Sequence, residues 1–204
     1  MDKLLNYIKF DKKYVFFSMV LVILGIITGS LFIVILNSAD KNLVIEYITD
    51  FIDSIKNDSI NNIDIFKNTL LINYIIIIII SIIGFTYFFF PVNIIVLFYK
   101  AFIIGFSLAA FILTYKFRGI LLSIIYIIPH SIINILLFSL LVSFTLKLSI
   151  NMIKHIIKKK EVNMRIYFNK YLYMFLIFIF LTTLTSTYES FIVPKLIKLF
   201  AKII

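Results

Sequence analysis

The feature that most limits what this chain can form is a series of long apolar runs. The run from Tyr14 to Leu36 contains no charged residue, and four further runs of similar character follow it. A helix needs about 20 predominantly apolar residues to cross the hydrocarbon core of a bilayer. Only 15% of the residues are charged, against about a quarter in soluble domains. The sequence therefore predicts an all-α, polytopic membrane protein.

We predict about five transmembrane helices within a single integral-membrane domain that covers residues 1–204. The predicted spans are residues 14–36, 70–90, 94–114, 119–146 and 171–193. The second and fifth spans are predicted to stop at Pro91 and Pro194, because proline cannot continue a helix. The first span is too long for the apolar part of a cleaved signal peptide and is interpreted as a retained signal anchor.

Two amphipathic segments accompany the spans. Residues 37–69 carry six of the ten acids of the chain: Asp40, Glu46, Asp50, Asp53, Asp58 and Asp64. The first half of this segment also has apolar residues at a spacing of four, namely Leu43, Tyr47, Phe51 and Ile55. This spacing predicts an outer amphipathic helix that lies on the membrane surface or on the bundle. The last segment, VPKLIKLFAKII, alternates lysines with apolar residues and predicts an interfacial helix.

The basic residues predict the orientation in the membrane. The formal net charge of +10 would suggest nucleic acid as the partner of a soluble protein. In a membrane protein the positive-inside rule and anionic lipid headgroups account for it, so we expect the lipid bilayer as partner and no nucleic acid. The distribution of Lys and Arg favours a cytoplasmic N-terminus and an extracytoplasmic C-terminus in the cell membrane.

Small residues recur on one face of two predicted spans. The first span contains Gly25 and Gly29, and the third contains Ala101, Gly105 and Ala109, each four residues apart. Such stripes let helix backbones approach closely, which favours helix association in lipid. We expect the two stripes to meet within one bundle, and a homodimer through the glycines is the alternative.

Two charged residues fall inside the predicted spans. Lys100 lies near the start of the third span, where its long side chain can extend to the inner interface as a topological anchor. A structural ion pair or a contact with a lipid headgroup is the alternative. Glu189 lies near the outer end of the fifth span, and we expect it to pair with Lys195 or Arg118. Ionisable residues inside a membrane are candidates for function.

The stretch YIIPHSIINILL, from Tyr126 to Leu137, places a proline and a histidine in the middle of the fourth span. Pro129 lacks an amide donor and favours a kink. His130 shares one helix face with Ser123, Tyr126 and Asn134. This stripe is interpreted as a buried hydrogen-bonded brace, and a substrate or proton site is the alternative.

No pattern typical of an enzyme is found in the sequence. The chain has two histidines and no cysteine, so no set of metal ligands is expected. Phosphate-binding glycine loops and nucleophile motifs are also missing. We therefore expect a protein without catalytic, cofactor-binding or metal-binding residues.

The order of several segments resembles the stage II sporulation protein M family. These segments are ILGIITGSL, the outer amphipathic loop, LFYKAFIIGF, IIPHSIIN and YESFIVPKLIKL. By this resemblance, the residues that match the family pattern are Lys100, Gly105, Pro129, His130, Glu189 and Pro194. Ser131 stands where many members have glycine, and Asn134 stands where an acid is frequent.

The resemblance implies a role in the engulfment of the forespore by the mother cell. It implies a non-enzymatic scaffold that localises peptidoglycan-degrading enzymes at the septal membrane. The competing hypothesis is a transporter-like permease, or a lipid- or ion-handling protein, that uses the polar stripe of span four. The third hypothesis is an assembly factor that acts outside sporulation.

Overall fold

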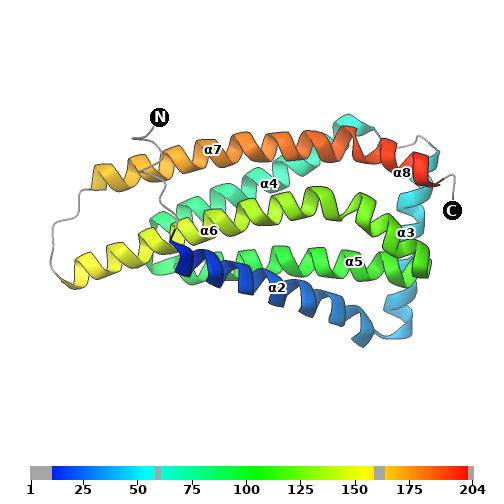
Figure 1. Cartoon of the computed structure of the whole chain (residues 1–204), viewed down its shortest axis with the longest axis horizontal. Coiled ribbons are helices and arrows are strands. Elements are labelled where there is room, and N and C mark those ends of the chain that lie inside the picture. The colour runs from blue at the N-terminus through cyan, green and yellow to red at the C-terminus, as the bar shows by residue number, and fades with distance from the viewer. Residues whose placement is uncertain (1–10, 58–60, 159–163, 202–204) are drawn as a thin grey trace.

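The computed structural model describes residues 11–57, 61–158 and 164–201, and the regular elements in these ranges are helices. The long helices are α2 (Lys12–Ile35), α4 (Asn62–Phe85), α5 (Phe90–Tyr126), α6 (Ile128–Ile157) and α7 (Met164–Phe191). Five helices are long and apolar enough to cross a membrane, which confirms the predicted polytopic helical fold. The long helices lie side by side as a bundle (Figure 1).

Two shorter helices lie at one end of the bundle. Helix α3 (Ser38–Lys56) crosses the ends of the long helices, and α8 (Val193–Ala201) lies at the same end (Figure 1). The predicted amphipathic segment thus contains α3, whose Asn37 side chain caps it by accepting a hydrogen bond from Asp40 N at 2.8 Å. The last residues of the predicted interfacial helix, 202–204, lie outside the described residues.

A small apolar cluster joins α3 and α8 to the bundle. Its buried members are Ile52, Ile55, Phe111, Leu122, Ile127, Val193 and Ile197. In the second half of the predicted apolar stripe of α3, Ile55 is therefore buried and Phe51 is half-buried. Leu43 and Tyr47, in the first half, are 62% and 80% exposed.

The chain reverses direction within the segment assigned to α5. Lys116 has φ 50° and ψ −124°, and no other non-glycine residue in the described ranges has a positive φ. A Cβ on Gly119 would lie 2.7 Å from the Phe111 carbonyl carbon, whereas eight residues of continuous helix would separate them by about 12 Å. Residues 117–126 therefore fold back on the preceding helix, and the reversal falls between the predicted third and fourth spans.

Each of the three prolines lies at the start of a helix. Pro91 lies in the first turn of α5, after the 3-10 turn Tyr87–Phe89, and Pro194 lies in the first turn of α8. Pro129 lies in the first turn of α6. A proline is tolerated there because the first-turn N–H groups have no partner within the helix. Helices α4 and α7 end a few residues before the prolines that were expected to stop them.

Helix α6 continues well past the predicted end of the fourth span at residue 146 and reaches Ile157. Hydropathy marks only the part of a helix that lies in lipid. The helical hydrogen bonds continue into the polar residues that follow, so the helix is longer than the span.

The two small-residue stripes face each other between α2 and α5. A Cβ on Gly25 would lie 2.6 Å from the Ala101 Cβ, and a Cβ on Gly105 would lie 2.8 Å from Ile26 Cα. Gly29 is equally close to the α5 backbone around Phe102. Ala109 is half-buried. Both stripes are thus used within one chain, and a homodimer stays a prediction.

The interior of the bundle away from α3 is closed by apolar and hydrogen-bonded side chains. Buried apolar residues from five helices pack there, among them Val22, Ile77, Leu97, Leu141 and Met174. Asn93, with no exposed surface, donates from Nδ2 to Ile80 O and to Thr145 Oγ1, both at 3.1 Å. This half of the bundle is a packed core.

Candidate functional site

A cavity of about 640 Å³ lies between the packed core and α3. Five helices contribute to its wall: α3, α4, α5, α6 and α7. The polar or charged residues that line it are Thr69, Asn73, Lys100, Ser107, His130, Ser131, Asn134 and Glu189. A cavity of this size that combines apolar walls with a few convergent polar groups is the usual form of a ligand site.

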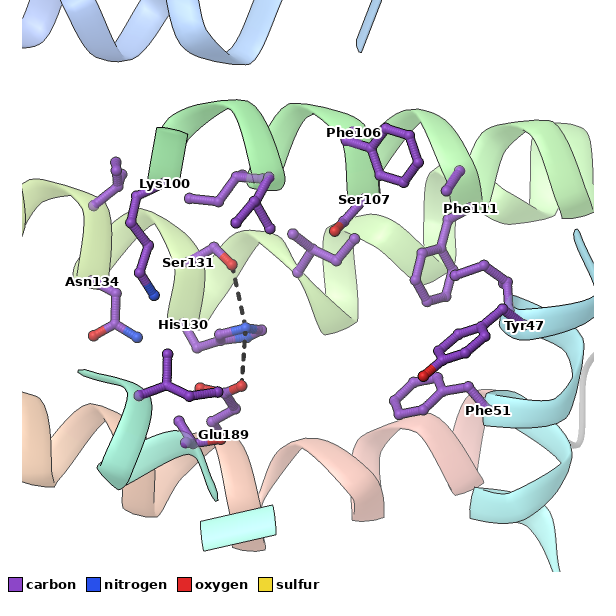
Figure 2. Close-up of a pocket in the computed structure, with 18 of the residues that line it drawn as sticks. Tyr47, Phe51, Lys100, Phe106, Ser107, Phe111, His130, Ser131, Asn134 and Glu189 are labelled. Carbon is purple, nitrogen blue, oxygen red and sulfur yellow. Dashed lines mark hydrogen bonds and ion pairs between the residues drawn. The ribbon is translucent and has the colours of Figure 1, made fainter. Parts of the chain in front are cut away.

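His130 lies one turn after the junction between α5 and α6. The backbone keeps α-helical dihedral angles at Ile127 (φ −85°, ψ −47°), where Ile127 N donates to Ser123 O at 2.9 Å and Ser131 N donates to Ile127 O at 3.0 Å. Pro129 supplies no N–H, so the helical hydrogen bonds lack one donor at this point. His130 is 8% exposed, and its ring points into the cavity (Figure 2).

The carboxylate nearest to His130 comes from α7. Glu189 Oε1 lies 3.7 Å from His130 Nε2, and the Ser131 hydroxyl lies 3.2 Å from the same nitrogen (Figure 2). We expected Lys195 or Arg118 beside Glu189, but the ion pair that the structure shows is with His130. The fold therefore places an acid beside His130 that the spacing of residues in the sequence did not indicate.

Lys100 is directed into the bundle. Its Nζ donates to Asn73 Oδ1 at 3.3 Å and lies 5.4 Å from the centre of the Phe138 ring. Lys100 is ten residues from the start of α5, which is about 15 Å along the helix. Its side chain is therefore not the interfacial anchor that the sequence suggested.

Asn73 connects Lys100 to α7, and sequence analysis missed it. Its Nδ2 donates to Ser186 Oγ at 3.3 Å, and the residue is 4% exposed. The sequence does indicate Asn73 as a candidate, because it is a strongly polar residue beside the isoleucine run of the second span. A single amide in such a run is expected to face other helices rather than lipid.

Asn134 forms a second link between α6 and α7. The Thr185 hydroxyl donates to Asn134 Oδ1 at 2.6 Å. Of the predicted polar stripe, His130 and Asn134 line the cavity, while the Ser123 hydroxyl donates to Ile120 O at 2.8 Å. The Tyr126 side chain lies outside the described part of the structure.

The cavity thus combines an ammonium group, a histidine–carboxylate pair, hydroxyls and amides with apolar walls. Within the described ranges, no three His, Cys, Asp or Glu residues are grouped so that they could hold a metal ion. The chemistry that this arrangement offers is binding through charge and hydrogen bonds in a site largely shielded from water.

Fold and site together define a multi-pass helical membrane protein with a charged cavity among its membrane-crossing helices. Residues 18–194 match the model of the family described as Stage II sporulation protein M, so the chain belongs to that family. Membership makes it a sporulation-associated membrane protein, and the family is not a known enzyme family. Comparison with curated proteins and with solved structures gives no match.

Proposed function

We propose that the protein is a non-enzymatic membrane scaffold that localises peptidoglycan-degrading enzymes at the septal membrane during engulfment. The observation that carries this proposal is the family match, which extends from α2 to the start of α8. The described helices α3 and α8 supply a compact surface at one end of the bundle. In the proposed orientation, with the N-terminus cytoplasmic and the C-terminus extracytoplasmic, this surface faces the cell wall.

The exposed acids of α3 are the proposed contact. Glu46 and Asp50 lie on α3 and are exposed. Acids at an interface suit a partner with a basic surface, because complementary charge speeds association and selects the partner. The buried residues Ile52 and Ile55 instead fix α3 to the bundle.

The test is affinity purification of the full chain from cells entering sporulation, with peptidoglycan-degrading activity measured in the purified material. We expect Glu46→Gln with Asp50→Asn to reduce that activity several-fold. The matched control, Glu46→Asp with Asp50→Glu, keeps the charges and is expected to retain it. Unchanged activity with the neutral pair would count against docking through α3, and loss with both pairs would point to altered folding of α3.

A permease-type function is the second candidate, and the charged cavity is the observation that favours it. Transport requires access from both sides of the membrane, whereas the core beneath the cavity is filled by Leu97, Leu141 and their neighbours. A second state with that core opened would be needed. Solute or ion flux into liposomes that hold the purified protein, abolished by His130→Ala, would favour transport over the scaffold.

A further inference from the structure

The exposed residues at the rim of the cavity lie on α3, α4 and α5. Among its lining residues, Leu43, Tyr47, Ile72 and Ile103 are between 41% and 80% exposed. Ile72 and Ile103 lie on the membrane-crossing helices α4 and α5, within the predicted spans 70–90 and 94–114. Their exposed surfaces would contact acyl chains, so the route into the cavity leads from the bilayer.

The inner end of the cavity carries the Lys100 ammonium group, which has more N–H donors than its one hydrogen bond to Asn73 uses. A lysine ammonium has three N–H donors, and the hydrogen bond shown for Lys100 Nζ is to the Asn73 amide oxygen. Glu189 also attracts Lys100, but the residue that forms a close ion pair with Glu189 is His130. Glu189 is the acid among the described lining residues, and it attracts Lys100 without a direct ion pair to it. A shielded charge is stabilised further by a hydrogen-bonded counter-ion.

The rest of the wall suits an apolar chain. Ile103 lines the cavity, and Phe106, Phe111 and Tyr47 lie on its side away from Lys100 (Figure 2). Ser131 lies at the polar end beside His130, and Ser107 lies nearer to Phe106 (Figure 2). Polar groups gathered at one end and an apolar channel toward lipid together match an amphiphile rather than a water-soluble solute.

We propose that this cavity binds an anionic amphiphile from the bilayer, with its headgroup at Lys100 and its chain along the α3–α5 wall toward the lipid. The anionic headgroup would form a direct ion pair with Lys100, which Glu189 attracts only without such contact, and the apolar chain would cover Ile103 and Phe106. This binding goes beyond the scaffold function and does not depend on it. The affinity purification can show that wall enzymes are not recruited while the binding experiment still shows that the cavity binds an anionic amphiphile.

The experiment measures binding of 1-oleoyl-lysophosphatidic acid to the full chain in a neutral detergent by native mass spectrometry. Monooleoylglycerol has the same chain without the charge, and inorganic phosphate has the charge without the chain. We expect lysophosphatidic acid to bind at least tenfold more tightly than either. Equal binding of monooleoylglycerol would overturn the role of the anion, and equal binding of inorganic phosphate would overturn the role of the chain.

Two variants locate the ligand. Lys100→Met keeps the apolar stem and is expected to weaken lysophosphatidic acid binding at least tenfold. The control Lys195→Met removes an exposed charge outside the cavity and is expected to change it less than twofold. Ile103→Trp enlarges an exposed rim residue without entering the core, so it tests the site even if Lys100→Met does not fold. Wild-type binding by a folded Lys100→Met or by Ile103→Trp would overturn the proposal.

Discussion

Adding one methyl group at Gly105 is predicted to separate α2 from α5. The new Cβ would lie 2.7 Å from the Ile26 carbonyl carbon and 2.8 Å from Ile26 Cα, which are backbone atoms that cannot rotate away. Carbon atoms pack at about 3.5–4.0 Å, so the helices must move apart by about 1 Å. The movement also weakens the hydrogen bond from Ser30 Oγ to Gly105 O, which is 3.0 Å long.

The expected cost follows from two opposing effects. Overpacking of a close interface costs about 1–3 kcal/mol, and the overlap with backbone places Gly105→Ala at the upper end. Alanine offsets about 1 kcal/mol of this, because it favours the helix more than glycine does. The net loss in the free energy of unfolding is therefore about 2 kcal/mol, which lowers Tm by about 4–8 °C in a chain of this size.

The assay is thermal unfolding of the purified protein in detergent, followed by circular dichroism. Val20→Ile is the control, because it adds one carbon to an exposed side chain of α2. A double variant tests whether the overlap with the Ile26 backbone causes the loss of stability. Ile26→Ala in the Gly105→Ala background should not restore Tm, since the overlap is with the Ile26 backbone. A Tm for Gly105→Ala within about 1 °C of wild type, or full recovery with Ile26→Ala, would refute the reasoning.

Three further predictions address the orientation, the core and the cavity. In cysteine-free wild type, Asn42→Cys should react with a membrane-impermeant maleimide in intact cells and Lys158→Cys should not, and the reverse would invert the topology. Asn93→Ala should lower the free energy of unfolding by about 1–3 kcal/mol by leaving buried polar groups without a partner, and an unchanged melting curve would contradict this. His130→Leu should destabilise the fold more than His130→Gln, because glutamine retains a donor near Glu189. Equal melting temperatures for these two variants would argue against His130 as a hydrogen-bonded brace.

The main features of the fold were predictable from composition and periodicity. Runs such as Tyr14–Leu36 are long enough to cross a bilayer, and a helix satisfies every backbone hydrogen bond there, so the all-α class follows. The glycine stripe at Gly25 and Gly29 was visible because it follows helical spacing on a single helix. Both inferences use only residues that are close in the sequence.

The cavity was less predictable because its residues come from helices far apart in the sequence. Lys100, His130 and Glu189 were each identified, but one-dimensional spacing does not indicate which helix faces which. Lys100 near the start of a predicted span favoured an interfacial anchor, and Glu189 near a span end favoured a neighbouring base. Asn73 was overlooked because a single amide hardly changes the mean hydropathy of its span.

The sequence by itself determined that the chain is a helical membrane protein, because the bilayer admits few structures and helical periodicity is local. Only the tertiary structure decided that α3 covers one end of the bundle, and that Glu189 lies beside His130 while Lys100 bonds to Asn73. The reason is physical. Membrane helices lack a strong hydrophobic drive to associate with one another, so close packing at positions such as Gly105, and polar contacts between helices, select their neighbours.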